Sequence, residues 1–158
     1  MGERAIYGEG IMLDVPYVGQ RFGYDCGPAS LAMVFSYQGV EVPYEDLLSC
    51  IEGGPDGGTT RRQMEKIAER YGFSARARSH GTLEDIIREL DAGNPVIVDW
   101  KPSEVGHYSV LRGYGDGWLY VRDPKVLRRC RIGPERFLRT WGYDKPENWY
   151  LVLKHKKQ

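Results

Sequence analysis

The sequence predicts one α+β domain, and three observations lead to that prediction. Its 158 residues suit a single domain with a sizeable core. Apolar residues recur at helical spacing in segments up to Ala92, whereas from Pro95 onward they alternate or run together as in strands. Helices followed by strands favour an antiparallel sheet over an alternating parallel one. We expect the domain to span residues 11–154, between a loose lead-in (1–10) and a tail (155–158).

The first part of the chain is expected to be mainly helical. A short strand over Ile11–Val18 is interrupted by Pro16, which suits an edge or a strand end. Glu52–Gly58 is expected to be a flexible loop, and Phe73–Arg78 a brief extended piece. The predicted helices run from Cys26 to about Gln38, over Pro43–Ile51, over Arg61–Tyr71 with Thr59 or Thr60 as cap, and over Leu83–Ala92 with Thr82 as cap.

The last part of the chain is expected to form the sheet. A turn over Gly113–Gly117 joins its second and third strands, and a basic loop follows Pro124. A short helix is expected from Pro134 through Trp141. The predicted strands are Pro95–Trp100, Gly106–Arg112, Trp118–Asp123 and Trp149–Leu153.

Composition excludes several classes of function. The 22 basic and 22 acidic residues cancel, so no nucleic-acid partner is expected. No apolar run approaches the roughly 20 residues that span a bilayer, and the N-terminus lacks the apolar core of a secretory signal. Three cysteines without paired spacing indicate reduced thiols and a cytoplasmic setting. The sequence has no zinc spacing, phosphate-binding loop or dinucleotide fingerprint, so no metal or cofactor is expected.

Cys26 opens the first long predicted helix and is the candidate nucleophile. A thiol at a helix N-terminus faces unpaired backbone N–H groups and the positive end of the helix dipole, and both favour the thiolate. Gly27 permits close approach, and Pro28 suits the first helical turn. The alternative is that Cys26 is a small buried hydrophobic residue.

His107 is the candidate base, because the other two histidines lie in a turn and in the tail. A hairpin centred on Gly115 would set His107 opposite Asp123, close enough for the carboxylate to orient the imidazole. A two-residue turn at Asp116 and Gly117 would put the two side chains on opposite faces, so this reading requires an odd-numbered turn. Asp123 would also suit the turn before Pro124, and Asp99 is an alternative orienting group.

Gln20 lies six positions before Cys26 and is the candidate oxyanion donor. Attack on a carbonyl creates an oxyanion that preplaced donors stabilise. The amide of Gln20 supplies N–H groups, and the backbone N–H of Cys26 supplies another. The alternative is a solvent-exposed loop glutamine.

These residues resemble those of the bacteriocin-processing peptidases, family thirty-nine of the cysteine peptidases in the papain-like clan. The resemblance is carried by Asp14-Val-Pro-Tyr, Gln20-x5-Cys26-Gly-Pro-Ala-Ser-Leu-Ala-Met, Gly106-His107-Tyr-Ser-Val and Val121-Arg-Asp123-Pro. It implies a papain-like fold, with the nucleophile helix packed on a C-terminal antiparallel sheet. It also implies Cys26 as nucleophile, His107 as base and then acid, Asp123 as orienting group and Gln20 as oxyanion donor.

The expected function is therefore a thiol peptidase that acts on a peptide or protein substrate through an acyl-enzyme on Cys26. Members of the family often form the N-terminal domain of ABC exporters. This sequence has neither a membrane span nor a nucleotide-binding motif, so the resemblance supports a stand-alone module. Two alternatives stay open: an acyl transferase or transpeptidase, and a catalytically idle module of the same fold that binds peptides.

Overall fold

Seven strands pair into one antiparallel sheet in the computed structural model, which describes residues 2–103, 105–142 and 147–157. The strand order is β2-β7-β3-β4-β5-β6, and β1 pairs with β4 outside this path. The strands are β1 (Ile11–Met12), β2 (Phe73–Arg78), β3 (Val96–Trp100), β4 (His107–Gly115), β5 (Trp118–Asp123), β6 (Val126–Ile132) and β7 (Tyr150–His155).

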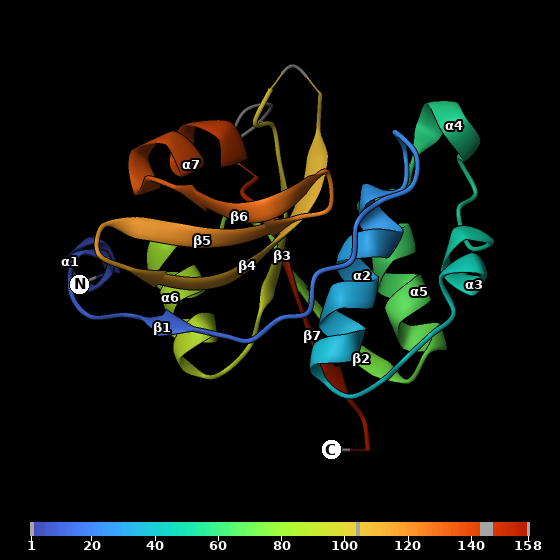
Figure 1. The fold of residues 1–158 in the computed structure, drawn as a ribbon, viewed down its shortest axis with the longest axis horizontal. Coiled ribbons are helices and arrows are strands. Elements are labelled where there is room, and N and C mark those ends of the chain that lie inside the picture. Colours follow the sequence, from blue (N-terminus) through green and yellow to red (C-terminus); the bar gives the residue numbers. More distant parts are fainter. Residues whose placement is uncertain (1, 104, 143–146, 158) are drawn as a thin grey trace.

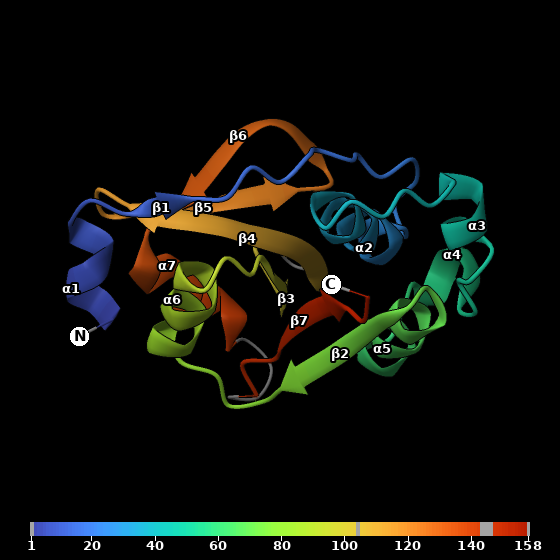
Figure 2. The ribbon, with the colours of Figure 1, turned by 90° about the horizontal axis from the view of Figure 1, so that it is seen from below.

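The helices gather in two groups at opposite ends of the molecule (Figures 1 and 2). The group that includes α2 and α5 stands at one end, and the group that includes α6 and α7 covers the other part of the sheet. The helices are α1 (Gly2–Tyr7), α2 (Cys26–Tyr37), α3 (Tyr44–Leu48), α4 (Gly54–Gly57), α5 (Arg61–Arg70), α6 (Leu83–Asp91) and α7 (Pro134–Trp141). Within the part of the chain that the structure describes, none of these helices has the length and apolar character needed to cross a membrane.

The helix α2 packs against β4, and this contact brings the start of the helix to the end of the sheet. Its inward residues from Gly27 to Phe35 are largely buried. At its far end Phe35 stacks on Phe73 of β2 with ring centroids 4.4 Å apart, and Gly39 follows with a φ of 82°. A positive φ favours glycine, so the helix ends where the sequence predicts.

The caps of α5 and α6 follow the sequence closely. Oγ1 of Thr60 accepts a hydrogen bond from the backbone N–H of Gln63, and the backbone N–H of Thr60 donates to Oε1 of Gln63. Thr82 and Asp85 form the same reciprocal pair at α6. Thr60, not Thr59, is therefore the cap of α5, and both helices begin where the capping pattern indicates.

Several local expectations were wrong. Residues 2–7 of the expected loose lead-in form α1, because Ile6 finds a fully buried site against α6 and the sheet. The strand expected over Ile11–Val18 is limited to Ile11 and Met12, and the expected loop over Glu52–Gly58 contains α4. Met1 of the lead-in and Gln158 of the tail lie outside the described residues.

The expected basic loop after Pro124 is also wrong, because the strand β6 occupies it. This strand is an edge of the sheet, so only one side of it pairs with a neighbour. β6 is an edge strand with exposed arginines, so it lacks the apolar pattern from which the other strands were predicted. The α+β class and the helix-on-sheet arrangement are confirmed.

Candidate active site

Cys26 is the first residue of α2 and lines a cleft between that helix and the sheet. Its side chain is half-buried, and the dipole of α2 presents its positive end there. The cleft has a volume of about 350 Å³. It is lined by Gly23, Tyr24, Cys26, Gly57, Gly58, Thr59, Asp99, Val105, Gly106, His107 and Tyr108.

The imidazole of His107 lies on the opposite wall, at the start of β4, and is held by Asp123 at the end of β5. Nε2 of His107 is 2.6 Å from Oδ1 of Asp123, and both side chains are about nine-tenths buried, at 12% and 10% exposure. A carboxylate accepts, so Nε2 carries the hydrogen and Nδ1 remains for the sulfur. Oδ1 of Asp123 also accepts the N–H of Lys125 at 2.9 Å. The carboxylate of Asp123 thus contacts both the imidazole ring of His107 and the turn that follows β5.

The route to this contact differs from the one the sequence suggests. The β4–β5 turn is the two-residue Asp116-Gly117, whose φ angles of 54° and 87° are those of a type I′ hairpin turn. Gly115 pairs with Trp118, so the register centred on Gly115 was wrong.

A β-bulge between Leu111 and Gly113 restores the contact. One extra residue in β4 shifts the pairing, so that Val110 lies opposite Arg122. Asp123 then falls in register with Ser109, two residues from His107 and on the same face of the sheet. The extra residue that brings His107 and Asp123 to the same face of the sheet therefore lies in β4, at the bulge, and not in the β4–β5 turn.

The protonation of His107 is set by opposing effects. Burial lowers the pKa of the imidazole, but hydrogen bonds to Asp123 and Cys26, together with their negative charges, outweigh it and raise the pKa to about 9. The imidazolium is therefore the favoured form near neutral pH. Cys26 is among the causes of this shift, and the two side chains line the same cleft.

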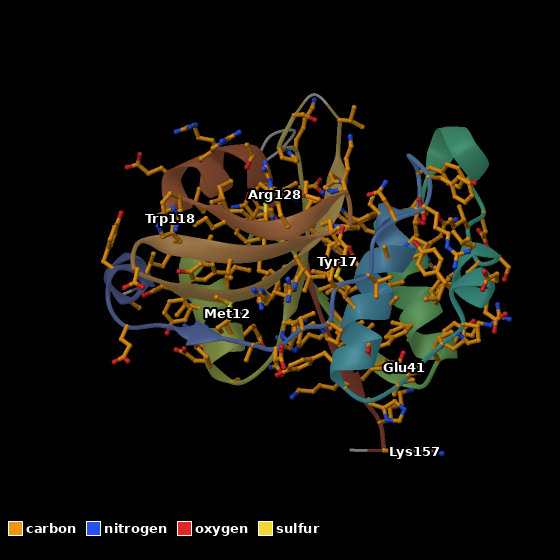
Figure 3. The ribbon with its side chains drawn as sticks, in the orientation of Figure 1. Met12, Tyr17, Glu41, Trp118, Arg128 and Lys157 are labelled. Atoms are coloured by element: carbon orange, nitrogen blue, oxygen red, sulfur yellow. The ribbon has the colours of Figure 1, made fainter. Side chains whose placement is uncertain are left out.

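Gln20 belongs to the loop that leads into α2. Its Nε2 donates to the carbonyl of Phe22 at 2.6 Å, and its backbone N–H donates to the carbonyl of Pro124 at 2.9 Å. Tyr17, which lies where the sheet meets α2 (Figure 3), donates to the same Pro124 carbonyl at 3.0 Å. The loop is thus fastened to the turn that follows Asp123. Gln20 is not among the described residues that line the cleft, and its role as oxyanion donor stays a prediction.

Asp25, directly before Cys26, is the residue that sequence reasoning missed. It is fully buried, and its carboxylate accepts the backbone N–H groups of Arg21 and Phe22, each at 2.8 Å, and the hydroxyl of Tyr44 at 2.7 Å. Burial and these interactions raise the pKa of Tyr44, so its hydroxyl stays a donor. An aspartate at this position usually indicates a helix cap, yet its side chain makes no cap bond to α2. Its position beside Cys26 was the one available signal.

Asp99 also lines the cleft, but its partner is Arg61. Nε of Arg61 donates to Oδ2 of Asp99 at 2.9 Å, and a second nitrogen of Arg61 pairs with Glu147. Burial raises the pKa of Asp99, and the bond to Arg61 opposes that rise. The structure therefore pairs Asp123, and not the alternative Asp99, with the imidazole.

Comparison with known proteins gives a consistent result. The model of the peptidase C39-like family matches residues 12–145. The transport/processing ATP-binding protein ComA of Streptococcus pneumoniae is 33% identical over 120 residues, which are 74% of this chain and 16% of ComA. The chain thus spans about one sixth of the length of that relative.

Two solved structures share the fold. The first is a double glycine motif protease from an AMS/PCAT transporter in complex with its leader peptide. It is 26% identical, and the match covers 92% of this chain and 94% of that one with a TM-score of 0.71. The peptidase domain of Streptococcus ComA is 24% identical, covers 88% and 97% of the two chains, and has a TM-score of 0.69. These matches confirm the expected papain-like arrangement of helix and sheet.

Proposed function

The chain belongs to the peptidase C39-like family, and on that premise we propose that it hydrolyses peptide bonds through an acyl-enzyme formed on Cys26. One observation carries the proposal. The Cys26 thiol at the start of α2 lines the same cleft as the His107 imidazole, whose Nε2 is held 2.6 Å from the Asp123 carboxylate. A nucleophile, a base and an orienting group in this relation are the requirements of thiol catalysis.

The proposed reaction begins with the thiolate–imidazolium pair. The sulfur of Cys26 forms a bond to the substrate carbonyl carbon, and the carbonyl electron pair moves onto the oxygen. As the C–N bond breaks, His107 gives its proton to the departing amine and a thioester remains. His107 then takes a proton from water as the oxygen of that water attacks the thioester carbonyl carbon. The C–S bond then breaks, which releases the acid and restores the thiolate–imidazolium pair.

The remaining residues serve the oxyanion and the ring. Asp123 keeps Nδ1 of His107 directed at the sulfur and stabilises the positive charge on the ring. The backbone N–H of Cys26, at the free start of α2, is one proposed donor to the oxyanion. The Gln20 amide is the second, because its bond to Phe22 uses only one of the two hydrogens on Nε2.

We propose peptides or proteins as substrates and the cytoplasm as the setting. Support for a peptide comes from the related protease that was solved with its leader peptide. Four glycines in the cleft lining leave backbone groups open to an extended chain: Gly23, Gly57, Gly58 and Gly106. The three cysteines are free thiols, in keeping with a reducing compartment.

The direct test compares the wild-type protein with Cys26→Ala on a broad peptide library, read by mass spectrometry. We expect cleavage by the wild type and none by Cys26→Ala, while the matched control Cys50→Ala keeps full turnover. Products that carry an added amine would instead identify an acyl transferase. A wild type that binds peptides without turning them over would identify the idle binding module.

A second measurement needs no substrate. Limited iodoacetamide treatment followed by peptide mapping should label Cys26 before Cys50 and Cys130, because Cys26 opens α2 and lines the cleft together with the His107 imidazole. Preferential labelling of either of the other two thiols would contradict the assignment of the nucleophile.

A further inference from the structure

A second cavity lies in the sheet region, apart from the catalytic cleft. It has a volume of about 350 Å³ and shares no lining residue with the cleft. Met12 and Trp118 mark this part of the molecule, and both lie toward the end of the sheet that is farther from α2 (Figure 3). The cavity is lined by Met12, Arg112, Tyr120, Cys130 and Arg131.

Arg112 enters this cavity from the bulge in β4. It is the residue between Leu111 and Gly113, where the pairing with β5 shifts. Its side chain is only 6% exposed, and its guanidinium donates to the carbonyl of Leu13 at 3.5 Å. A guanidinium loses hydration on burial, so an anion beside it gains a strong attraction.

Three other lining residues belong to one row across the sheet. Met12 pairs with Gly113, Gly113 with Tyr120, and Tyr120 with Arg131, and paired residues project from the same face. Gly113 is required in this row, because a Cβ there would lie 2.4 Å from the carbonyl oxygen of Ile11. The close approach of β1 that this glycine permits brings Met12 to the cavity.

The guanidinium of Arg131 packs on the ring of Trp118. Its guanidinium carbon lies 4.1 Å from the centre of the Trp118 ring, a contact that orients the planar fork. The hydroxyl of Tyr120 makes only a long contact, 3.5 Å, to the carbonyl of Gly115, so it can turn to donate to a ligand.

The charged residues described in the lining are both arginines. Of the described residues that line the cavity, two are arginines and none is a carboxylate. Burial, with a smaller contribution from the charge of Asp123, raises the pKa of the Cys130 thiol, so the thiol adds no negative charge near neutral pH. The Asp123 carboxylate itself is bound to His107 and to the N–H of Lys125.

We propose that this cavity binds a small organic anion, with a carboxylate or phosphate group on an apolar body. The two guanidinium groups and the Tyr120 hydroxyl take the oxyanion, in the bidentate manner typical of arginine. The thioether of Met12 and the ring of Tyr120 contact the apolar body, which fills the part of the cavity that a bare oxyanion leaves open.

The test is calorimetric titration of the full chain with four probes at constant ionic strength: benzoate, phenyl phosphate, neutral benzamide and inorganic phosphate. We expect benzoate or phenyl phosphate to bind at one saturable site, and benzamide to bind at least about tenfold more weakly because it lacks the charge. Stronger binding of benzoate would identify a carboxylate ligand, and stronger binding of phenyl phosphate a phosphate ligand. Inorganic phosphate should bind more weakly than phenyl phosphate, since it has no apolar body.

Variants locate the site. Arg131→Gln, at an exposed position, should weaken binding about tenfold, and Tyr120→Phe should weaken it by a smaller factor. Arg136→Gln, an exposed arginine of α7, is the matched control and should leave binding unchanged. Equal binding of benzoate and benzamide, no saturable binding of either charged aromatic probe, or unchanged affinity in Arg131→Gln would overturn the proposal.

Discussion

The two walls of the catalytic cleft are built by different means. On the sheet wall, strand pairing and one bulge place His107 and Asp123, and the core behind them fixes both strands. On the loop wall, regular structure is lacking between β1 and α2, and one buried carboxylate, Asp25, gathers the backbone before Cys26. A long-range pairing thus places His107, the proposed base, whereas a local network of side-chain bonds shapes the surroundings of Cys26, the proposed nucleophile.

This difference predicts how each wall fails. A change on the sheet wall removes a chemical group but leaves the strands paired, so it acts on the proton transfers. A change on the loop wall leaves every reacting group present but loosens the backbone that carries them, so it acts on the geometry of the oxyanion site.

The largest effect is expected at the base. His107→Asn removes the group that accepts and returns the proton, and such groups contribute about 10²–10⁴-fold to the rate. We expect kcat/KM on a cleaved peptide to fall within that range while the circular dichroism spectrum is unchanged. Activity retained within a factor of two would show that another group is the base.

The next effect is expected on the pH profile. The pKa of His107 is raised from 6.5 to about 9, so the imidazolium form, and its pairing with Asp123, is present at low pH and is lost as pH rises through about 9. Asp123→Asn keeps an acceptor for Nε2–H but removes the charge. We expect the alkaline limb of kcat/KM to move from near pH 9 toward lower pH.

The matched variant Asp116→Asn alters a turn carboxylate of the same hairpin, away from the ring. Its profile should superimpose on that of the wild type. An alkaline limb that stays in place in Asp123→Asn would mean that the carboxylate does not set the charge on the ring.

On the loop wall, Asp25→Ala should impair both stability and turnover. It leaves the part-buried N–H groups of Arg21 and Phe22 without their acceptor, and a hydrogen bond to a charged group contributes about 1.5–3 kcal/mol. Chemical denaturation measures the loss of unfolding free energy. We expect the midpoint to fall and kcat to fall with it, and an unchanged midpoint would refute the role assigned to this carboxylate.

Tyr44→Phe is the mildest change to the same network, because it removes one hydrogen bond worth about 1 kcal/mol. We expect kcat to fall a few-fold with KM nearly constant. Tyr37→Phe is the control, since the Tyr37 hydroxyl bonds the carbonyl of Gly93 at the far end of α2, at 2.9 Å. If the two variants lower kcat equally, the loop has no special influence on turnover.

The same contrast explains what the sequence could predict. The sequence could single out Cys26, His107 and Asp123 as candidate site residues. It contains only three cysteines and three histidines, so few positions could supply a thiol and an imidazole. The contact between His107 and Asp123 was anticipated through the wrong register, because Gly113, the glycine beside the bulge at Arg112, was assigned to the turn. The strand β6 was missed because an edge strand does not need two apolar faces.

The loop wall was the less predictable one. Asp25 resembles an ordinary helix cap, and nothing in its surroundings points to Tyr44, nineteen positions later, as its partner. Gln20 was noticed for its spacing, but its actual bond to the Phe22 carbonyl depends on the loop conformation. Networks of side chain and backbone in irregular segments leave no periodic signal.

The proposed chemistry requires the sulfur of Cys26 and the ring of His107 to be electrostatic partners in the resting protein. The most direct measurement is an NMR titration of the His107 ring nitrogens in the wild type and in Cys26→Ala. The structure predicts a pKa of about 9 in the wild type and a lower pKa once the sulfur is removed. A ring that titrates near 6.5 in both proteins would contradict the account.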